Sequence, residues 1–537
     1  MALFDRHWRL IVVLSVTLVT FSAVVRFPFS IIDDPSNVVR NPLVAAPLSQ
    51  GLMGLLRTPA MGYPHTVTVL SFALDRALAG EDPSYYHAVN LLVHLVNIAL
   101  LYMLLLRFGI STEWAWLPAA IFALHPLVAE PVSWVIARKD LLATGFLLGA
   151  FNVIATGPAE TAGVFRDWRW GTAAALCILA IFSKPAAITA PVLLWLVIRY
   201  ARPSWTLRDV AIALAPIVAA GAFTMAVGVP DLQAQGAVVQ RSVMQSGFDM
   251  TRAWTIHVWH LFWPRDLLAE YERTATADPA VWKIVAAFAV SLAIAAAALR
   301  TPRGSAARMA VLFIIAAGAP VAGVLPTWHW TADSYVYLPL VGVVMLAAAS
   351  LPAADVPRAW TLAWAVLPLL AWLSYQQSIT WSSGPATFAP VAAHYADNPR
   401  PLNRLAFAYL YENRPDQAAP LLVKLDAMAP GFEFNRAQRA WAAYRLGEAS
   451  RGDAVIARCV AAADVECLTV FWNDVLAMNI APDRPGTGAL ADAYLGLAEA
   501  GTPLPAATLR GIADALRQRG LIALAFRATV AAARSER

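Results

Sequence analysis

The chain has 537 residues, of which 59% are hydrophobic and only 14% are charged, and its formal net charge is +5 at pH 7. A soluble domain usually carries about 25% charged residues. Together with a mean hydropathy of +0.57, this composition places most of the chain in lipid and excludes a disordered chain, a fibrous repeat and a small disulfide-bonded scaffold. No basic run typical of nucleic-acid binding occurs, so we do not expect nucleic acid as a partner.

Apolar runs that are long enough, or nearly so, to cross a bilayer recur along the first 380 residues. They lie near 8–27, 87–107, 114–130, 140–157, 170–183, 186–200, 209–229, 281–299, 308–325, 335–351 and 359–378. We therefore expect about eleven spans, the first of which is uncleaved because no small-residue cleavage site follows it. The apolar run 253–268 is rich in Trp and His, which indicates a re-entrant or surface helix rather than a span.

The positions of Arg residues predict the orientation of these spans, because loops on the inner side of a membrane carry an excess of Lys and Arg. The basic N-terminal segment and the Arg-bearing loops 158–169, 199–208 and 300–308 all fall on the inside if there are eleven spans. The first loop, 28–86, and the residues after 379 then fall on the outer face.

The character of the chain changes near residue 380. Residues 1–380 form the expected transmembrane domain, whereas residues 381–537 are more polar and have the helical period of a soluble α-helical domain. Within the second part, 399–430 reads as two helices around a turn and fits the 34-residue tetratricopeptide unit. A generic bundle of helical hairpins is the alternative. Either arrangement is α-helical and offers a surface for contact with another protein.

The three cysteines predict little chemistry. Cys177 lies in an apolar run and is expected simply to be packed there. Cys459 and Cys467 lie in the outer domain, where an oxidising compartment lets disulfides persist. A bridge between them requires a turn, because eight residues of continuous helix span about 12 Å. A bridge and two separately buried thiols both remain open.

Two adjacent carboxylates, Asp33 and Asp34, open the first outer loop. Membrane anchoring does not need them, and carboxylates at such a surface can act as a general base or bind a cation. The alternative is a solvated turn or a helix N-cap, which the following Pro35 favours.

A group of charged residues, Arg138, Lys139 and Asp140, lies at the outer end of a span. Adjacent cations on the outer side oppose the usual distribution of charge, so we expect this group to hold an anionic phosphate. Snorkelling of the side chains to lipid headgroups is the alternative. Lys184, in a tight hairpin between two spans, and Arg252, further along the outer face, are candidates for the same phosphate.

Four further residues are expected to bind substrate. His125 and Glu130 lie just before the charged group, and Asp333 and Tyr335 lie in an aromatic stretch before a later span. A carboxylate between aromatic rings suits a sugar hydroxyl, although aromatic residues alone are ordinary at a membrane interface.

Metal binding is a weaker hypothesis. His257 and His260 share one helical face, but without a third ligand at a fixed spacing we do not expect zinc. A divalent metal is compatible with the many carboxylates on the outer face, although nothing in the sequence requires one.

The chain resembles the multi-span glycosyltransferases of GT-C type, in particular the O-mannosyltransferases that carry tetratricopeptide repeats and their bacterial relatives. The segments that carry this resemblance are IIDDPSNVVRNPLV, SYYHAVNLLVHLVNIALLYMLL, ALHPLVAEPVSWVIARKDLLA, FSKPAAITAPVLLWL, ADSYVYLPLVG and QQSITWSSGPATFAPVAAHYADNP. They span nearly the whole membrane part in the family's order. Two of the family's patterns, Tyr-Arg-Pro and Asp-Arg-Tyr, differ here and read Tyr63-Pro64-His65 and Asp333-Ser334-Tyr335.

The resemblance implies an all-α fold, in which a polytopic membrane helix bundle of GT-C type precedes a tetratricopeptide-like helical domain. It implies transfer of a sugar, as in O-mannosylation, from a polyprenyl-phosphate-linked donor to a protein or glycan hydroxyl on the outer face, with inversion. Asp33 or Asp34 then holds the catalytic place. The implied partners are membrane lipid, the lipid-linked sugar and the acceptor. The expected location is a bacterial inner membrane, with the C-terminal domain in the periplasm.

Two other functions remain open on the sequence. A non-catalytic membrane scaffold for glycan or envelope assembly would use the helical domain to recruit partners, and the Arg missing from the Tyr-Arg-Pro pattern favours it. A transporter or flippase usually has two related halves with polar breaks at mid-membrane, and the sequence has no such internal symmetry.

Overall fold

The computed structural model describes residues 2–156, 167–202, 204–234, 241–273, 280–302, 305–321, 330–350, 356–429, 433–461, 487–500, 504, 506–518 and 522–535. The chain divides into two compact units, Met1–Thr387 and Phe388–Arg537. All regular elements in the described ranges are helices, and no strand occurs there. The expected all-α fold class is confirmed.

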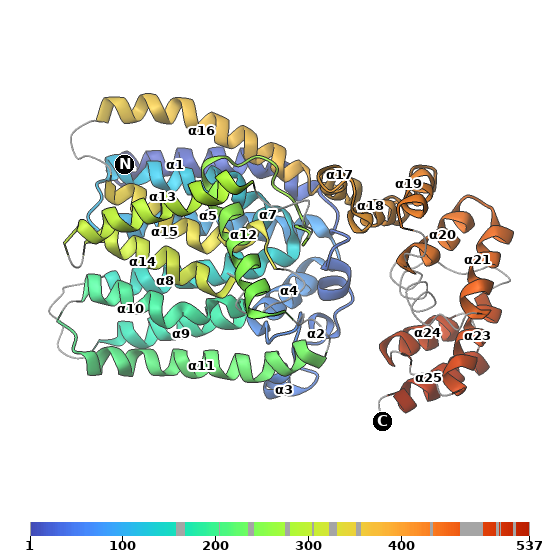
Figure 1. Ribbon diagram of the computed structural model, residues 1–537. Helices are drawn as coiled ribbons and strands as arrows, with labels where there is room; N and C mark the ends of the chain where they lie inside the picture. Colours follow the sequence, from blue (N-terminus) through green and yellow to red (C-terminus); the bar gives the residue numbers. More distant parts are fainter. Residues whose placement is uncertain are drawn as a thin grey trace. The chain divides into compact units, whose positions relative to one another are not determined.

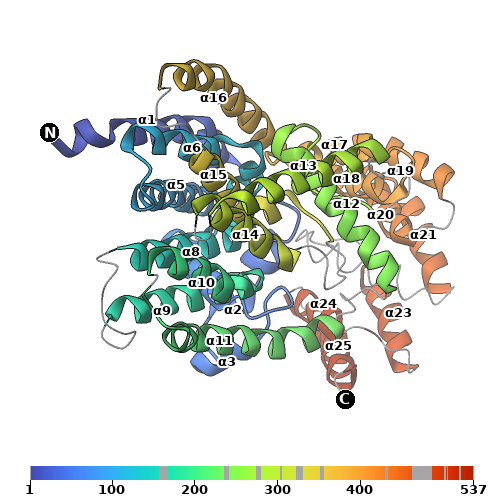
Figure 2. The same ribbon diagram turned by 60° about the vertical axis from the view of Figure 1, so that its left-hand side comes forward.

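The first unit is a bundle of long helices, drawn in Figure 1 and, from another side, in Figure 2. The long helices are α1 (Ala2–Phe21), α5 (Pro83–Arg107), α6 (Thr112–Leu124), α8 (Arg138–Ala155), α9 (Trp168–Ser183), α10 (Ala190–Ala201), α11 (Leu207–Ala234), α13 (Val281–Arg300), α14 (Ala306–Gly318), α15 (Tyr337–Ser350) and α16 (Val356–Ile379). Each overlaps one of the eleven apolar runs, so the sequence located these helices correctly. Their interior is packed with fully buried apolar side chains such as Leu101, Phe122 and Phe151.

The remaining helical elements of the first unit lie between these helices along the chain. They are η1 (Ser22–Arg26), η2 (Pro35–Val39), α2 (Pro42–Ala45), α3 (Gly51–Arg57), α4 (Thr66–Ala79), η3 (Pro126–Val128), α7 (Ala129–Ser133), η4 (Val135–Ala137), η6 (Pro185–Thr189), α12 (Val243–Phe262), η8 (Ala319–Val321) and η9 (Asp333–Val336). In Figure 1, α2, α3, α4, α7 and α12 lie toward the right-hand end of the bundle.

Five helices in the described ranges are long and apolar enough to cross a membrane: His7–Arg26, Pro83–Arg107, Leu207–Gln233, Val281–Arg300 and Asp333–Ser350. A sixth candidate is the pair Thr112–Leu124 and Pro126–Ser133, which is bent by 56°. Three apolar helices are shorter: Trp168–Ser183, Pro185–Ala201 and Ala306–Val321. The protein is therefore a multi-pass membrane protein, whereas the number of eleven spans stays a prediction.

Two of the apolar helices end at a proline. α6 ends before His125 because Pro126 lacks an amide hydrogen and disfavours helical geometry in the residue that precedes it. The His125 ring accepts a hydrogen bond from the Leu127 amide at 3.2 Å and so caps η3. α9 ends in the same way, at the pair Lys184–Pro185. Such breaks place a polar residue at a helix end without a long loop.

The apolar run 253–268 is not a single element. Its first part belongs to α12, which begins at Val243 with a capping box between Ser242 and Gln245 and ends at Phe262. The remainder is not helical, since Pro264 interrupts the helical hydrogen-bond pattern. α12 is not among the helices of the described ranges that are apolar enough to span.

The second unit is made of helical hairpins, and α17 (Gly384–His394) lies at its boundary. Its helices are α18 (Pro399–Tyr411), α19 (Pro415–Met428), α20 (Glu433–Arg445), α21 (Ala449–Ala461), α23 (Thr487–Glu499), α24 (Ala506–Gln518) and α25 (Ile522–Ser535). α20 begins 34 residues after α18, and α21 begins 34 residues after α19. Asn413 and Gly447 occupy corresponding turns, and both have a positive φ, of 59° and 82°. This is the period of a tetratricopeptide repeat, and the assignment stays a prediction.

The three cysteines are divided between the two units. Cys177 lies in the first unit and is buried and free, as expected. Cys459 in α21 is buried and disulfide-bonded. Cys467 lies outside the described residues, so the pairing of these two residues stays a prediction.

Candidate active site

Polar residues from five segments meet at one end of the first unit. The segments are the first loop after η1, α7, the start of α8, the break between α9 and α10, and η9. These segments lie at the ends of long helices or between them along the chain, and α7 lies toward the right-hand part of the bundle in Figure 1. Most of the charged residues that the sequence suggested for substrate binding lie here.

Asp34 anchors the first loop. Its side chain is fully buried, and its two carboxylate oxygens accept hydrogen bonds from the amides of Ser30 at 2.8 Å and Ile136 at 3.0 Å. Burial raises the pKa of Asp34 well above its ordinary value, although both amide hydrogen bonds act in the opposite direction. Close by, the Trp134 indole donates to the Ile32 carbonyl at 3.0 Å. These contacts fasten the loop to the turn that precedes α8.

Asp33 differs from its neighbour in every respect that matters for chemistry. Its side chain is partly exposed and makes no hydrogen bond to any described residue. Its φ of 62° lies in the left-handed region, which is uncommon outside glycine and occurs at functional sites. Asp33 is close enough to Lys139 and Tyr335 to interact with both electrostatically. Of the two carboxylates, Asp33 is thus the one whose side chain is unengaged among the described residues, and its role in catalysis stays a prediction.

Lys184 is paired with Asp140. The Lys184 ammonium group contacts the Asp140 carboxylate, and their side chains are only 11% and 6% exposed. The same ammonium group lies 4.9 Å from the centre of the Tyr335 ring, at cation–π distance. Residues that lie far apart in the sequence thus meet at the helix break before Pro185.

Lys139 has no such partner. Its side chain is half-buried, with the ammonium nitrogen 6.0 Å from the centre of the Trp134 ring. It makes no hydrogen bond or ion pair with a described residue, yet Lys184, Asp140 and Asp33 are all within electrostatic range. Lys139 is thus a free hydrogen-bond donor beside a second cation, which is the arrangement that an anionic phosphate requires.

Arg138 is occupied by the fold itself. Its side chain is fully buried, and its guanidinium group pairs with Asp75 of α4. It also donates to the side chain of Asn90 at 2.7 Å and to the carbonyl of Tyr86 at 2.8 Å, and it lies over the Phe72 ring at 4.6 Å. This arrangement differs from the expected phosphate contact, because the guanidinium group joins α4, α5 and α8 and is not accessible.

Glu130 and Asp333 form a buried acidic pair behind the lysines. They are 3% and 2% exposed and interact electrostatically with each other, and Glu130 also interacts with Asp140 and Lys184. Asp333 accepts a hydrogen bond from the Tyr271 hydroxyl at 2.7 Å. Neither carboxylate oxygen of Glu130 makes a well-formed hydrogen bond within the described ranges, although Ser334 lies nearby. A buried carboxylate in this state favours a ligand that can donate hydrogen bonds.

Two of the expected residues have other surroundings. Both ring nitrogens of His125 are engaged, one by the Leu127 amide and the other by the Leu261 carbonyl at 3.2 Å, so this residue ties α6 to α12. Arg252 lies over the Trp330 ring at 5.0 Å, in a cluster with Arg273. The structure therefore does not group either residue with Lys139 and Lys184.

The histidines of α12 hold the segment that leads into η9. His257 contacts the Thr331 hydroxyl at 2.9 Å, and His260 lies 3.5 Å from the Asp333 carboxylate. Among the residues that the structure describes, no three of His, Cys, Asp and Glu lie in a position to hold a metal ion.

One residue near the site was not singled out for it from the sequence. His65 is buried, and its Nδ1 lies 2.7 Å from the Ala60 carbonyl. Burial, with a further contribution from the nearby charge of Lys139, lowers the pKa of His65 to about 3. In the sequence analysis, His65 appears only at the place where the family pattern has Tyr-Arg-Pro. It is a neutral group near the lysines, and no local sequence motif predicts its position at the site.

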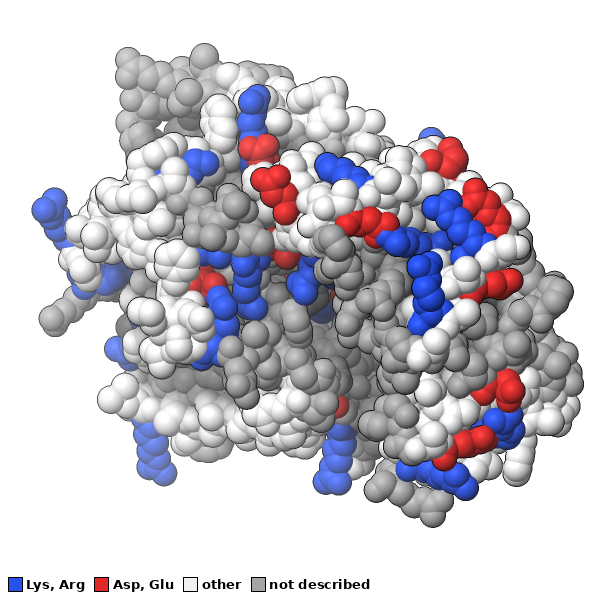
Figure 3. All heavy atoms as spheres, turned by 45° about the vertical axis from the view of Figure 1, so that its right-hand side comes forward, with Lys and Arg blue, Asp and Glu red and all other residues white. Residues whose placement is uncertain are grey.

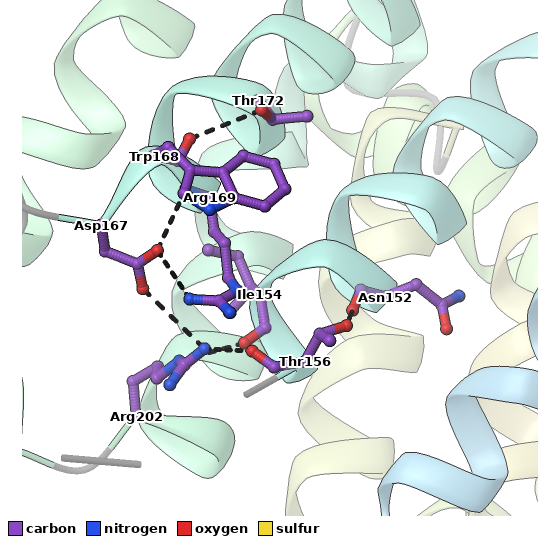
Figure 4. A network of polar contacts seen from close by, with 8 residues as sticks. All are labelled: Asn152, Ile154, Thr156, Asp167, Trp168, Arg169, Thr172 and Arg202. Atoms are coloured by element: carbon purple, nitrogen blue, oxygen red, sulfur yellow. Dashed lines mark hydrogen bonds and ion pairs between the residues drawn. The ribbon is translucent and has the colours of Figure 1, made fainter. Parts of the chain in front are cut away.

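The opposite ends of α8 and α9 carry a different polar network (Figure 4). The side chains of Arg169 and Arg202 point toward the Asp167 carboxylate, at 3.1 and 3.9 Å. Arg202 also donates to the carbonyls of Ile154, at 3.1 Å, and Thr156 at the end of α8. These contacts join the end of α8, the start of α9 and the residue that follows α10, so this network holds three helices of the bundle together.

Charges of both signs are mixed on the surface. On the face drawn in Figure 3, basic and acidic side chains lie beside each other rather than in areas of a single sign. Ion pairs such as Arg517–Asp514 and Arg527–Glu499 illustrate this mixing in the second unit. A broad basic surface of the kind that follows a nucleic-acid backbone is not visible on this face among the described residues.

Parts of this sequence are similar to known O-mannosyltransferases. Protein O-mannosyl-transferase TMTC1 of Homo sapiens is 33% identical over 129 residues, which make up 22% of this chain and 15% of that protein. Protein O-mannosyl-transferase Tmtc2 of Drosophila melanogaster is 35% identical over 126 residues, or 23% of this chain and 13% of that protein. The chain thus spans only about a seventh of the length of these relatives. The expected resemblance is confirmed over these segments.

Two further comparisons complete the picture. No known family signature matches the chain. The crystal structure of ArnT from Cupriavidus metallidurans bound to undecaprenyl phosphate aligns with 85% of this chain and 79% of that one, with a TM-score of 0.41 and 20% sequence identity.

Proposed function

We propose that this protein is a membrane glycosyltransferase, which moves a sugar from a polyprenyl-phosphate-linked donor to a hydroxyl group on a protein or glycan. The observation that carries the proposal is the meeting of the unengaged carboxylate of Asp33 with two lysines, Lys139 and Lys184, at one end of the bundle. A carboxylate near Lys139, which in turn lies near Lys184, suits the displacement of a phosphate by a hydroxyl group. The local similarity to O-mannosyltransferases supports the same activity.

The reaction follows from the charges of these residues. The acceptor oxygen attacks the anomeric carbon of the sugar from the face opposite the phosphate, and its proton passes to the Asp33 carboxylate. The bond between the anomeric carbon and the phosphate oxygen breaks, and its electron pair leaves with the polyprenyl phosphate. The configuration at the anomeric carbon is therefore inverted. Lys139 and Lys184 stabilise the negative charge that grows on the departing phosphate.

The buried acidic pair provides the natural place for the sugar. Sugar hydroxyls would donate hydrogen bonds to the carboxylate oxygens of Glu130, which have no well-formed bond to a described residue. Asp333, held in place by Tyr271, would accept a further hydroxyl. Tyr335 would lie against the same ligand beside Lys184. In this arrangement, the contacts of Glu130, Asp333 and Tyr335 would determine which sugar the protein accepts.

The remaining parts of the proposal concern location and acceptor. The helical hairpins of the second unit would present or select the acceptor protein or glycan. The outer face that carries the site would be the periplasmic side of a bacterial inner membrane. A reporter fused after residue 537 that is active only outside the cytoplasm tests this orientation, and activity of a reporter that works only in the cytoplasm would contradict it.

The activity is tested with the purified full chain in lipid, supplied with polyprenyl-phosphate mannose, other polyprenyl-phosphate sugars and peptide acceptors. Mass spectrometry should detect a glycosylated product with at least one donor, and the Asp33→Asn variant should form far less of it. A correctly folded protein that forms no product with any donor would instead support the non-catalytic scaffold.

A further inference from the structure

We propose that Asp140 is an internal counter-ion, which competes with the substrate phosphate for Lys184 and thereby promotes release of the product. The inference rests on the function proposed above and adds to it a control on phosphate affinity. It departs from the expectation that Asp140 itself helps to bind the donor, because a carboxylate repels a phosphate.

The two lysines of the site are in different electrostatic states. Lys184 is already neutralised by a carboxylate that is 6% exposed, whereas Lys139 makes no ion pair with a described residue. Both lysines are within electrostatic range of Asp140, so one buried carboxylate acts on the pair. A phosphate that arrives at Lys139 must therefore compete with Asp140 for Lys184.

The second oxygen of Asp140 is also informative. Asp140 Oδ1 contacts Lys184, while Oδ2 is buried and makes no hydrogen bond within the described ranges. A carboxylate held only by structural contacts would normally have both oxygens satisfied, as Asp34 does in the same site. Within the described ranges, Asp140 makes its direct side-chain contact with Lys184, which is also the cation that a phosphate would take.

The charge on the ligand changes during the proposed reaction. The donor is a phosphodiester with one negative charge, whereas the released polyprenyl phosphate is a monoester with nearly two. Two lysines without a counter-ion would hold the product more tightly than the donor. The return of Asp140 to Lys184 opposes this binding, because each contact that Lys184 makes with Asp140 is one that it cannot make with the phosphate.

The chain contains a matched control for the loss of a buried carboxylate. Asp167 is also buried and paired with cations, Arg169 and Arg202, but it lies in the network at the other ends of the helices (Figure 4). The substitution Asp167→Asn removes the same charge from a comparable pair. Asp140→Glu is a second control, which keeps the charge at the site.

The experiment is a titration of the purified full chain in detergent with a polyprenyl phosphate, followed by turnover measurements with the donor. We expect Asp140→Asn to bind the polyprenyl phosphate about tenfold more tightly and to be more strongly inhibited by it, with a lower kcat. Asp167→Asn should stay close to the wild type, and Asp140→Glu, which keeps the charge, should gain less affinity than Asp140→Asn. A gain in affinity is a result that mere structural damage would not give. Unchanged or weaker binding by Asp140→Asn would overturn the inference.

A double variant tests whether Asp140 acts through Lys184. Asp140→Asn combined with Lys184→Gln removes both members of the ion pair. Relative to Lys184→Gln alone, it should tighten phosphate binding less than Asp140→Asn does in the wild-type background, because the competition for Lys184 is gone. An equal or larger tightening in the Lys184→Gln background would overturn the inference. If the wild type neither binds polyprenyl phosphate nor transfers a sugar, the proposed function fails and the inference with it. If the wild type does both and these variants have no effect, only the inference fails.

Discussion

Asp34 accepts a hydrogen bond from the Ile136 amide at 3.0 Å, and this contact joins two segments that are 102 residues apart in the sequence. It brings the first loop against the turn that precedes α8, which carries Lys139 and Asp140. The neighbouring Asp33 is consequently held near Lys139, although its own side chain contributes no hydrogen bond to a described residue. One carboxylate of the pair therefore positions the other.

The first prediction separates the two roles. Asp33→Asn should lower kcat by about 10²- to 10⁴-fold, since it removes the general base, while thermal stability and donor binding stay nearly unchanged. Steady-state kinetics and thermal unfolding in detergent measure these quantities.

Asp34→Asn is the matched comparison. The amide replaces one acceptor oxygen by a donor that faces a backbone N–H group, so this variant should be less stable, by roughly 1–3 kcal/mol for a buried polar group left unsatisfied. Full turnover by Asp33→Asn, or a larger kinetic effect from Asp34→Asn at equal stability, would contradict the assignment.

The sequence predicted the helices well because hydrophobic periods and prolines are local signals. Each of the eleven apolar runs expected to be spans overlaps a helix, and the breaks before Pro126 and Pro185 follow from proline's missing donor. The acidic pair and the charged group could be picked out as candidates, since charges at a membrane surface stand out in an apolar chain. Local signals could not tell Asp33 from Asp34 or Arg138 from Lys139. The contacts that distinguish the two members of each pair join segments tens of residues apart in the sequence.

The second prediction concerns the neighbouring cations. Lys139→Ala should weaken binding of a polyprenyl phosphate about tenfold or more, because it removes a charge-assisted contact, without much effect on stability. Arg138→Ala should act in the opposite way and lower stability, because its guanidinium group holds Asp75, Asn90 and the Tyr86 carbonyl. A binding titration and an unfolding curve on both variants give the comparison. If Lys139→Ala and Arg138→Ala weaken phosphate binding equally and are equally stable, Arg138 also contributes to the phosphate site.

Arg138 illustrates what the sequence could not provide. It stands beside Lys139 in a run of charges, and both residues suit a phosphate equally well from their chemistry alone. Only the fold places Asp75, Phe72 and Asn90 around one of them. The contacts of Arg252 and His125 likewise come from other parts of the chain, and the substrate roles of these two residues stay predictions.

The third prediction tests the buried ion pair of Asp75 and Arg138. Asp75→Asn leaves a fully buried guanidinium group without its counter-charge, so stability should fall by about 3–5 kcal/mol. Glu81→Gln is the control, because it breaks an exposed ion pair. The side chains of Glu81 and Arg76 are 53% and 31% exposed, and such a pair contributes about 0–1 kcal/mol to stability. Thermal or chemical unfolding of both variants in the same detergent measures the difference. If both substitutions lower the free energy of unfolding by similar amounts, the buried ion pair does not stabilise α4 more than the exposed pair does.

The last prediction concerns pH and follows from His65. Burial lowers the pKa of His65 in the folded protein to about 3, whereas a histidine in an unfolded chain has a pKa of about 6.5. Above pH 6.5 the residue is neutral in both states, so it leaves the free energy of unfolding independent of pH. Between pH 6.5 and about 3 only the unfolded state binds the proton, and stability falls as the pH falls, by up to about 1.4 kcal/mol for each pH unit. His65→Asn removes this proton uptake, so unfolding curves recorded from pH 8 to pH 4 should be less steep in pH for the variant than for the wild type. The two should run parallel above pH 7. If the wild type and the variant lose stability equally on acidification, His65 is not held neutral in the folded protein.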